Sequence, residues 1–215
     1  MNGPRFDADY LRKVDNHLRG TLGLRELTPD AEGGAAMVAT VGSLRRGLPV
    51  AGDLDYIAPR PALDAQGRPM EADALYAVLS EHFYPAEEPA RDTRLGTAVK
   101  GLKPGFGMCN LLLELKSPKP ALLPIQIHRF WPGPQGNRGW IELIRTGPAE
   151  FGKAAMFRLQ NRGLKSREGF PHDRRGVRIA VPSEAVAFDL LGLPYLEPAH
   201  RHEDRVYSAN REDRR

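Results

Sequence analysis

The sequence predicts an α+β fold (mixed α/β), in which helices flank a mixed β-sheet and a smaller α+β unit follows. Segments with the two-residue period of strands and segments with the 3.6-residue period of helices both occur. They alternate along the chain without regular βαβ repeats, which is typical of this class. A chain of 215 residues is long enough for one hydrophobic core, or for a core and a small satellite.

The elements expected in the first half surround a glycine turn. A helix is expected from Asp7, whose side chain can cap it, to Arg19, because apolar residues recur there at helical spacing. Two β-prone runs, residues 36–41 and 53–57, lie on either side of the turn. Apolar residues return to helical spacing over residues 71–82, so a second helix is expected there.

The second half begins with two apolar runs, residues 109–115 and 122–130. We expect them to pair as antiparallel strands, because a loop rich in proline and lysine joins them. A further strand is expected over residues 140–146. A helix is expected over residues 148–162, closed by Gly163.

The last third is expected to hold two short strands and one helix. The strands are residues 164–167 and 177–181, and the helix runs from a cap at Ser183 to Leu191. From His200 onward the chain is rich in charged residues, which predicts a frayed or disordered tail.

The overall charge is mildly basic. Lys and Arg number 31 against 27 acidic residues, which gives a net charge of +4 and a pI near 9.3, and such an excess assists binding to a polyanion. Cations are concentrated between residues 158 and 178, where only Glu168 and Asp173 oppose them: Arg158, Arg162, Lys165, Arg167, Arg174, Arg175 and Arg178. This stretch is either a face that meets phosphates or an ordinary solvated surface.

Composition also bears on the compartment. The chain has no apolar run of about 18 residues that could span a membrane and no signal-peptide pattern at its start, so we expect a cytoplasmic protein. The single cysteine, Cys109, cannot form an internal disulfide, and its place in an apolar run predicts a buried, inert thiol. No cluster of Cys and His has metal-ligand spacing.

Two carboxylates at strand spacing form the chemical centre of the sequence. In Asp53-Leu54-Asp55 the period of two directs both carboxylates to one face, close enough to share hard cations such as Mg²⁺. Eleven residues before Asp53 lies Gly42-Ser43, a small pair that lets main-chain amides and a hydroxyl approach phosphate oxygens, with Arg46 as a charged clamp. Taken singly, the acidic pair is better explained by an exposed strand edge, and the Gly-Ser pair by a plain turn.

Together these elements form a long pattern with fixed spacing: Gly-Ser-x-Arg-Arg-Gly, four residues, and then Gly-Asp-x-Asp over residues 42–55. It closely resembles the signature of the family X DNA polymerases, which are polymerase-beta-like nucleotidyltransferases. Further resemblances to that family lie at residues 5–10, 106–111, 146–147 and 195–198. The resemblance implies a nucleotidyltransferase palm over residues 1–130, a thumb-like nucleotide-binding subdomain over 131–199 and a charged tail over 200–215.

The resemblance also implies roles for the matching residues. Asp53 and Asp55 are expected to be catalytic and to bind two ions of Mg²⁺ or Mn²⁺. The residues expected to hold the nucleotide and its phosphates are Gly42, Ser43, Arg46, Gly52, Arg5, Thr146 and Gly147. Thr146-Gly147 resembles the Thr-Gly of the family's nucleotide-binding turn, and we call this segment the nucleotide turn. In the family, the peptide bond after this glycine is cis. Because proline lowers the cost of a cis bond from ~3 kcal/mol to below ~1 kcal/mol, we predict a cis bond at Gly147–Pro148.

The activity implied is metal-dependent nucleotidyl transfer from a (d)NTP to a nucleic-acid 3′-hydroxyl. The chain would act as a minimal, monomeric family X DNA polymerase that extends primers or fills short gaps in DNA, as in DNA repair. Its partners would be a dNTP and primer-template or gapped DNA, and no membrane.

One departure from the family pattern bears on catalysis. The family's third carboxylate, which completes the metal site and accepts the proton of the 3′-hydroxyl, is replaced here by Gln126. An amide is not a base at neutral pH and is a poorer metal ligand. Glu114 and Glu142, on neighbouring expected strands, are candidates to replace the carboxylate. His128 is another, because it shares a strand face with Gln126 and its ordinary pKa suits base catalysis.

Two alternatives therefore stand beside polymerase activity. One is a nucleotidyltransferase that acts on another acceptor, such as tRNA or a protein, since such enzymes share the motif. The other is a weakly active or inactive module that binds nucleotides or DNA. The nucleotide turn also departs from the family, because Pro148, Ala149 and Gly152 replace polar residues, so base and sugar selection should differ. Lys153 and Arg158 either meet template or primer phosphates or belong to a solvated helix face.

Overall fold

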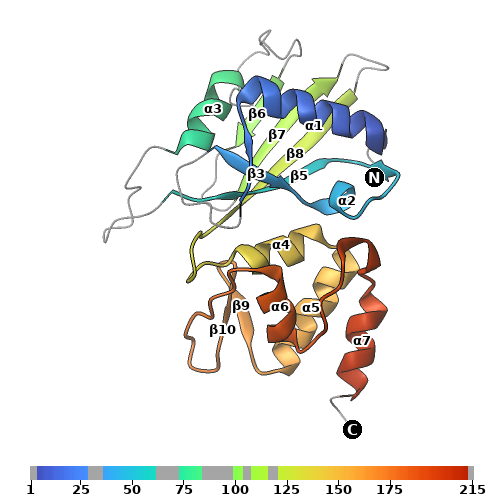
Figure 1. Cartoon of the computed structure of the whole chain (residues 1–215), viewed down its shortest axis with the longest axis vertical. Helices are drawn as coiled ribbons and strands as arrows, with labels where there is room; N and C mark the ends of the chain where they lie inside the picture. The colour runs from blue at the N-terminus through green and yellow to red at the C-terminus, as the bar shows by residue number, and fades with distance from the viewer. Residues whose placement is uncertain are drawn as a thin grey trace.

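The computed structural model describes residues 4–28, 36–61, 73–83, 99–103, 108–115 and 121–212. It is an α+β structure, as predicted, in which a mixed β-sheet with helices lies beside a mainly helical unit (Figure 1). We call the described residues up to 130 the N-terminal lobe and residues 131–212 the C-terminal lobe. Among the described helices, none has both the length and the apolar character needed to cross a lipid bilayer.

Strands dominate the N-terminal lobe. Its elements are β1 (Phe6–Asp7), α1 (Ala8–Leu22), β2 (Arg25–Glu26), β3 (Met37–Thr40), α2 (Gly42–Arg45), β4 (Val50–Ala51), β5 (Leu54–Pro59), α3 (Ala74–His82), β6 (Val99–Lys103), β7 (Met108–Leu115) and β8 (Ala121–Phe130). The strands expected at residues 36–41, 53–57, 109–115 and 122–130 are therefore confirmed. The expected helix over 71–82 is confirmed from Ala74 onward, and Glu71 and Ala72 lie outside the described residues.

Helices dominate the C-terminal lobe. Its elements are α4 (Arg138–Thr146), α5 (Ala149–Asn161), β9 (Lys165–Arg167), β10 (Phe170–His172), α6 (Glu184–Leu191), the 3-10 helix η1 (Pro198–His200) and α7 (Glu203–Glu212). The expected helix over residues 148–162 corresponds to α5, and the expected helix after Ser183 corresponds to α6. The hydroxyl of Ser183 accepts a hydrogen bond from Val186 N and caps α6, as predicted.

Among the described residues, the main sheet has six strands in the order β2-β3-β5-β8-β7-β6. Strands β5 and β8 are parallel neighbours at its centre, and β7 pairs with β8 antiparallel, as predicted. The register between β5 and β8 sets Leu54 beside Ile125 and Asp55 beside Gln126. Because side chains alternate between the two faces of a strand, the first pair points to one face of the sheet and the second pair to the other.

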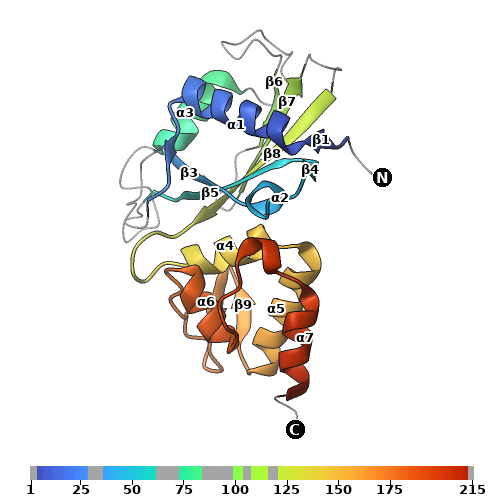
Figure 2. The ribbon, with the colours of Figure 1, turned by 45° about the vertical axis from the view of Figure 1, so that its right-hand side comes forward.

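The two faces of the sheet have different partners. Leu54 and Ile125 belong to a hydrophobic cluster that also contains Leu11 and Leu18 of α1 and Leu79 of α3, so both helices pack on this face (Figures 1 and 2). On the opposite face β5 and β8 meet α4 of the C-terminal lobe. The polar residues of β5 and β8 therefore point toward the region between the lobes.

Helix α1 begins where the sequence predicts. The carboxylate of Asp7 accepts hydrogen bonds from Asp9 N at 2.9 Å and Tyr10 N at 3.1 Å, which satisfies amides that a helix start otherwise leaves unpaired. The helix continues through Gly20 and ends at Gly23, whose φ of 62° gives a left-handed C-cap. Strands β1 and β4 pair antiparallel beside it and both contact it.

The strand predicted over residues 140–146 is wrong, because this segment is helix α4. Its buried side chains follow a spacing of three: Trp140, Leu143 and Thr146 all lie in the interior. Gly139 lets the helix approach the main chain of Ser183 closely, since a Cβ there would overlap it. The β-branched and aromatic composition that favoured a strand is overridden by this packing.

Two further expectations are corrected in the C-terminal lobe. Residues 177–181 form no strand, and only an isolated bridge joins Arg178 to His172, while β9 pairs instead with β10, a strand the sequence did not predict. The tail expected to fray contains helix α7, whose Val206 is fully buried in the same cluster as Phe151 and Leu191. Helix α7 therefore packs on α5 although its composition is mostly polar.

Candidate active site

A cavity of about 890 Å³ lies between the two lobes. Its walls come from α2 and β5 with the turn between them, from β8, and from the end of α4 with α5. It brings together nine of the residues singled out by the sequence: Arg5, Gly42, Ser43, Arg46, Gly52, Asp53, Asp55, Gln126 and Gly147. Segments up to about 140 residues apart in the chain thus meet in one cavity.

The two aspartates stand at the start of β5 and both line the cavity. Leu54 between them is fully buried in the core, which fixes the orientation of its neighbours. Burial raises the pKa of Asp53, and the nearby Arg5 and Arg46 oppose this rise. Burial and the charge of Asp53 raise the pKa of Asp55 to about 7. The site therefore concentrates negative charge that a cation would neutralise.

Gly42 makes the close approach between α2 and β5 possible. Its φ is 66°, a conformation that residues with a side chain adopt at a cost of about 1–2 kcal/mol. A Cβ at this position would also overlap the carboxylate of Asp55. The main chain of Gly42 and Ser43 can therefore lie directly beside the aspartates, as a phosphate-binding turn requires.

The two consecutive arginines of the motif contact the C-terminal lobe in different ways. Arg45 donates from Nη1 to Thr146 Oγ1 at 2.6 Å and forms a two-pronged ion pair with Glu184 at 2.7 and 2.9 Å. Arg46 lines the cavity, donates to the carbonyl oxygen of Thr146 and lies 3.2 Å from Ser43 Oγ. Thr146 itself is buried; among the predicted binding residues it joins the lobes and does not line the cavity.

The nucleotide turn has the predicted backbone. The Gly147–Pro148 peptide bond is cis, as predicted, and Gly147 has a φ of 64°. Gly147 lines the cavity, and a Cβ there would come within 3.2 Å of Arg46 Nη1. The turn thus sets the arginine of the motif against the start of α5.

The two glutamates proposed to replace the third carboxylate lie away from the position of Gln126. Glu142 lies on α4, where it pairs with Arg45 at 3.0 Å and with Arg138 at 3.5 Å, and it does not line the cavity. Glu114 pairs in register with Leu122 on β8, so its backbone lies four residues, about 13 Å, along the sheet from the level of Gln126. Neither position supplies a carboxylate in register with Asp55.

His128 lines the cavity, as its strand face predicts, but it is only 3 % exposed. Burial and the neighbouring charge of Arg145 lower its pKa to about 3. An imidazole with such a pKa is neutral at physiological pH and is a weak proton acceptor. The expectation that its pKa suits base catalysis is therefore wrong.

The C-terminal wall of the cavity contains residues that the sequence reasoning missed. Arg145, at the end of α4, carries a charge that lowers the pKa of Asp55 against the effect of burial. Along α5 the wall also contains apolar Met156 and the exposed ring of Phe157, next to Lys153, which the sequence had already singled out. Met156 and Phe157 follow Lys153 by three and four residues, and this spacing is the signal that could have identified them, since it puts them on one helix face with Lys153.

The basic stretch is not a single surface. Arg158 is 2 % exposed, and it donates hydrogen bonds to the carbonyl oxygens of Leu191 and Gly192 at the end of α6. It therefore stabilises the C-terminal lobe and cannot meet template or primer phosphates. Cys109 is buried, as predicted.

The donor set of the cavity fits a divalent cation bound jointly with a phosphate group. Asp53 and Asp55 offer hard oxygen ligands on one face, and burial combined with like charge raises the pKa of Asp55, so a cation there would relieve unfavourable charge. Within the described ranges, no three residues among His, Cys, Asp and Glu come together as a metal-binding group. Two carboxylates suit Mg²⁺ when substrate phosphates and water complete its coordination.

Part of the C-terminal lobe matches the model of a known protein family. Residues 144–202 match the family model of the DNA polymerase beta thumb, and no curated protein matches the chain. The matched segment runs from the last turn of α4 through α5, β9, β10 and α6 to η1. It includes the nucleotide turn and the α5 wall of the cavity. The match supports a relationship between this chain and the polymerase-beta-like proteins, and a thumb of this kind implies DNA binding.

Proposed function

We propose that this chain catalyses metal-dependent nucleotidyl transfer from a (d)NTP to the 3′-hydroxyl of DNA. It would act as a small, monomeric polymerase-beta-like enzyme that extends primers or fills short gaps. The observation that carries the proposal is the cavity in which Asp53 and Asp55 face the Gly42–Arg46 turn and the first turn of α5. The thumb match over residues 144–202 supports a polymerase over other nucleotidyltransferases.

In this proposal Asp53 and Asp55 hold Mg²⁺ or Mn²⁺, and a bound cation would neutralise charge on the triphosphate and on the reacting phosphoryl group. The main chain at Gly42 and Ser43, together with the Ser43 hydroxyl, would donate to oxygens of the β- and γ-phosphates. Arg46 would add a charge-assisted donor. Arg5 and Gly52 also line the cavity and lie close to each other, which suits the remaining phosphate oxygens.

The reaction forms a bond from the primer 3′-oxygen to the α-phosphorus and breaks the bond from that phosphorus to the pyrophosphate oxygen. The proton of the 3′-hydroxyl must also leave. Gln126, the register neighbour of Asp55, cannot accept it, and His128 is a weak acceptor because its pKa is about 3. We therefore expect the proton to pass to water or to an aspartate, with slow turnover.

The α5 wall would determine which nucleotides are accepted. Ala149 and Gly152 line the cavity near the nucleotide turn and carry no polar side chain. A sugar or base lying there would meet the helix itself and no discriminating hydrogen-bond donor. We therefore expect weak discrimination between ribonucleotides and deoxyribonucleotides.

A second candidate function is a nucleotide- or DNA-binding module with little or no turnover. Gln126 favours it, because this amide faces the cavity in register with Asp55, where a third carboxylate would otherwise complete a metal site. Such a module would bind a metal-nucleotide complex and DNA without transferring the nucleotide.

Primer extension with Mg²⁺ and with Mn²⁺ distinguishes these functions. Under the proposal the wild-type chain extends a labelled primer, Asp53→Ala does not, and Gln126→Asp gains roughly 10²-fold or more in kcat. Activity that persists in Asp53→Ala would come from a contaminating enzyme. No extension by the wild type, with extension by Gln126→Asp, would assign the native chain to the binding module. Labelled nucleotide on tRNA or on a protein, with none on the primer, would assign another acceptor.

A further inference from the structure

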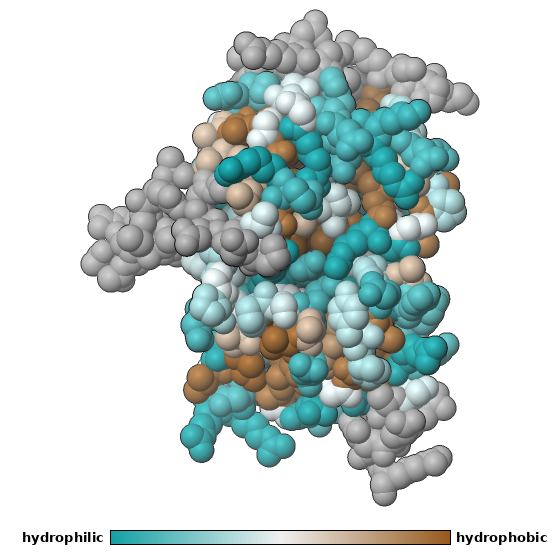
Figure 3. All heavy atoms as spheres, viewed as in Figure 1, coloured by the Kyte–Doolittle hydropathy of each residue, from teal (hydrophilic) through white to brown (hydrophobic). Residues whose placement is uncertain are grey.

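The positive charge of the chain is concentrated on one side of the C-terminal lobe. Residues 162–178 contain six cations and two acids, an excess of four that equals the formal net charge of the whole chain. All six cationic side chains are exposed, and we call them the basic face: Arg162, Lys165, Arg167, Arg174, Arg175 and Arg178. Hydrophilic side chains project from the lower left of the lobe in the space-filling view, where β9 and β10 lie (Figure 3).

Most cations of the basic face lack an acidic partner among the residues that the structure describes. Arg178 pairs with Glu168 at 2.9 Å and lies 5.1 Å from the ring centre of Phe170. Within the part of the chain that the structure describes, the other five form no ion pair. The second acid, Asp173, accepts hydrogen bonds from the main-chain nitrogens of Arg175 and Val177. Like charges left this close repel each other and attract a polyanion.

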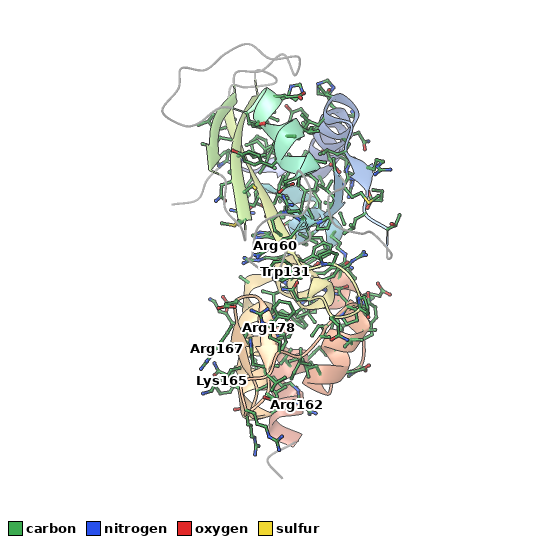
Figure 4. The ribbon with its side chains drawn as sticks, turned by 90° about the vertical axis from the view of Figure 1, so that its left-hand side faces the viewer. Arg60, Trp131, Arg162, Lys165, Arg167 and Arg178 are labelled. Carbon is green, nitrogen blue, oxygen red and sulfur yellow. The ribbon has the colours of Figure 1, made fainter. Side chains whose placement is uncertain are left out.

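An arginine and a tryptophan extend the basic face toward the lobe junction. Arg60 and Trp131 lie on the same side of the molecule as Arg162, Lys165, Arg167 and Arg178 (Figure 4). The guanidinium of Arg60 lies 4.8 Å from the ring centre of Trp131. Nε of Arg60 has no hydrogen-bond partner among the described residues, although it is buried. Both side chains are half-buried, so an aromatic surface and a cation are combined at this end of the face.

Helix α4 connects the cavity to the Arg60–Trp131 end of the basic face. Trp131 lies at the start of α4, because its carbonyl oxygen accepts from the N-cap Asn137 N at 3.1 Å, whereas Ile144 and Arg145 at the other end of α4 line the cavity. Helix α4 has nine residues, so its two ends are about 13 Å apart. A nucleic-acid strand of a few nucleotides can therefore reach from the cavity to the Arg60–Trp131 pair and continue along the basic face.

We propose that the basic face and the Arg60–Trp131 pair form a second DNA-binding surface, which holds an unpaired strand by its phosphates outside the cavity. Lys165 and Arg167 supply sequence-independent contacts to phosphates. The Arg60–Trp131 pair supplies a stacking site for an unpaired base, as cations and aromatic rings do in single-strand binding proteins. The inference rests on the proposed function for its choice of DNA as partner, but it requires no catalysis.

The test is the affinity for a fluorescein-labelled oligothymidylate of about 20 nucleotides, measured by anisotropy from about 50 to 200 mM NaCl. The test variant is Lys165→Ala/Arg167→Ala, and the matched control is Lys13→Ala/Arg25→Ala, which removes two exposed cations from the N-terminal lobe. We expect the test variant to weaken binding roughly tenfold or more at 0.1 M salt. Its slope of log affinity against log salt should fall by about 1.4, which is two contacts at ~0.7 each. The control should change affinity less than about threefold.

Equal losses in both double variants would overturn the proposal, because they would show a general effect of net charge. No loss in the test variant would also overturn it. If the wild-type protein binds phosphatidylserine vesicles through Lys165 and Arg167 but does not bind the oligonucleotide, the face would be assigned to a membrane surface. Trp131→Leu should weaken binding to oligothymidylate but not to a blunt duplex of equal length, and equal effects on both would contradict the stacking role.

The same assay separates this inference from the proposed function. Asp53→Ala should bind oligothymidylate with the wild-type affinity and salt slope while failing to extend a primer. If the wild-type chain does not extend primers but the Lys165→Ala/Arg167→Ala variant loses binding as expected, the second surface stands and catalysis fails. If extension occurs but its KM for primer-template is unchanged in that variant, and oligothymidylate binding is unchanged too, the surface fails alone.

Discussion

Glu184 connects the two lobes through Arg45, and replacing it with glutamine measures how much this connection stabilises the protein. The Glu184 side chain is 6 % exposed and accepts from Arg45 and from Nη1 of Arg201, at 2.8 Å for the latter. Burial raises its pKa, but the hydrogen bonds and charges of both arginines outweigh burial, so the pKa is lowered overall. The carboxylate is therefore stabilised in its ionised form.

The size of the effect follows from what glutamine leaves behind. Breaking a buried ion pair by removing one partner costs about 3–5 kcal/mol. Glutamine keeps the shape and one acceptor oxygen, and Arg45 retains Glu142 at 3.0 Å. Arg201, with 0 % side-chain exposure, keeps no carboxylate partner among the described residues. We therefore expect Glu184→Gln to cost about 3 kcal/mol. For a chain of this size that corresponds to a fall in Tm of about 6–12 °C.

Urea unfolding, followed by far-UV circular dichroism and by the fluorescence of Trp131 and Trp140, measures this loss. Glu197→Gln, at an exposed carboxylate nearby, is the matched control and should change stability by less than about 0.5 kcal/mol. Because the folded pKa of Glu184 is lowered from 4.5, its contribution is present above that pH and is lost as the pH falls below it. The gap between variant and wild type should therefore shrink below pH 4.5. A loss under 1 kcal/mol at pH 7 would refute the reasoning.

Two further predictions concern the cavity. Gly42→Ala should lower stability by at least about 1–2 kcal/mol, because φ of Gly42 is 66° and the methyl group would overlap Asp55. Isothermal titration with Mn²⁺ and dATP should also show weakened binding by this variant. The control Gly133→Ala, at a position with positive φ but open space, should lose stability without a change in binding. His128→Gln should flatten the acid dependence of stability. The pKa of His128 is about 3 in the folded protein, against the ordinary histidine value of 6.5. As the pH falls from 6.5 to about 4, the free energy of unfolding of the wild type should therefore fall by about 1.4 kcal/mol per pH unit relative to the variant. Parallel plots of this free energy against pH, measured by urea titration, would contradict the prediction.

Much of the N-terminal lobe could be predicted from the sequence, because its signals are local. The alternation in Asp53-Leu54-Asp55 separates a buried side chain from two that line the cavity. A fixed spacing from the Gly42-Ser43 turn identifies the other wall of the same cavity. In the C-terminal lobe, the cis bond at Gly147–Pro148 was predicted because the resemblance to the family X polymerases implies a cis bond there and proline lowers its cost.

The errors lie where contacts distant in sequence decide the outcome. Helix α4 has β-prone residues, but Trp140 and Leu143 pack into the C-terminal lobe at helical spacing. Arg158 belongs to a cationic stretch in the sequence, yet it is buried because α6 ends beside it and offers carbonyl oxygens. Val206 orders α7 by packing against α5, and composition alone does not reveal such a partner.

The register between Asp55 and Gln126 permits a test of metal binding that does not depend on turnover. Adjacent strands lie about 4.8 Å apart, so Gln126→Asp adds a carboxylate beside Asp55, whose pKa is already raised to about 7 by burial and by Asp53. Without a cation this repulsion should lower Tm in the presence of EDTA.

A cation shared by the three carboxylates would reverse the loss, because binding at 100 times Kd adds about 2.7 kcal/mol, equivalent to roughly 5–10 °C. Gln126→Asp should thus gain more in Tm from Mn²⁺ than the wild type does. Gln160→Asp, which adds the same charge at an exposed cavity residue on α5, should gain no more than the wild type. Equal gains in the two variants would mean that Asp53 and Asp55 do not hold a metal ion in this cavity.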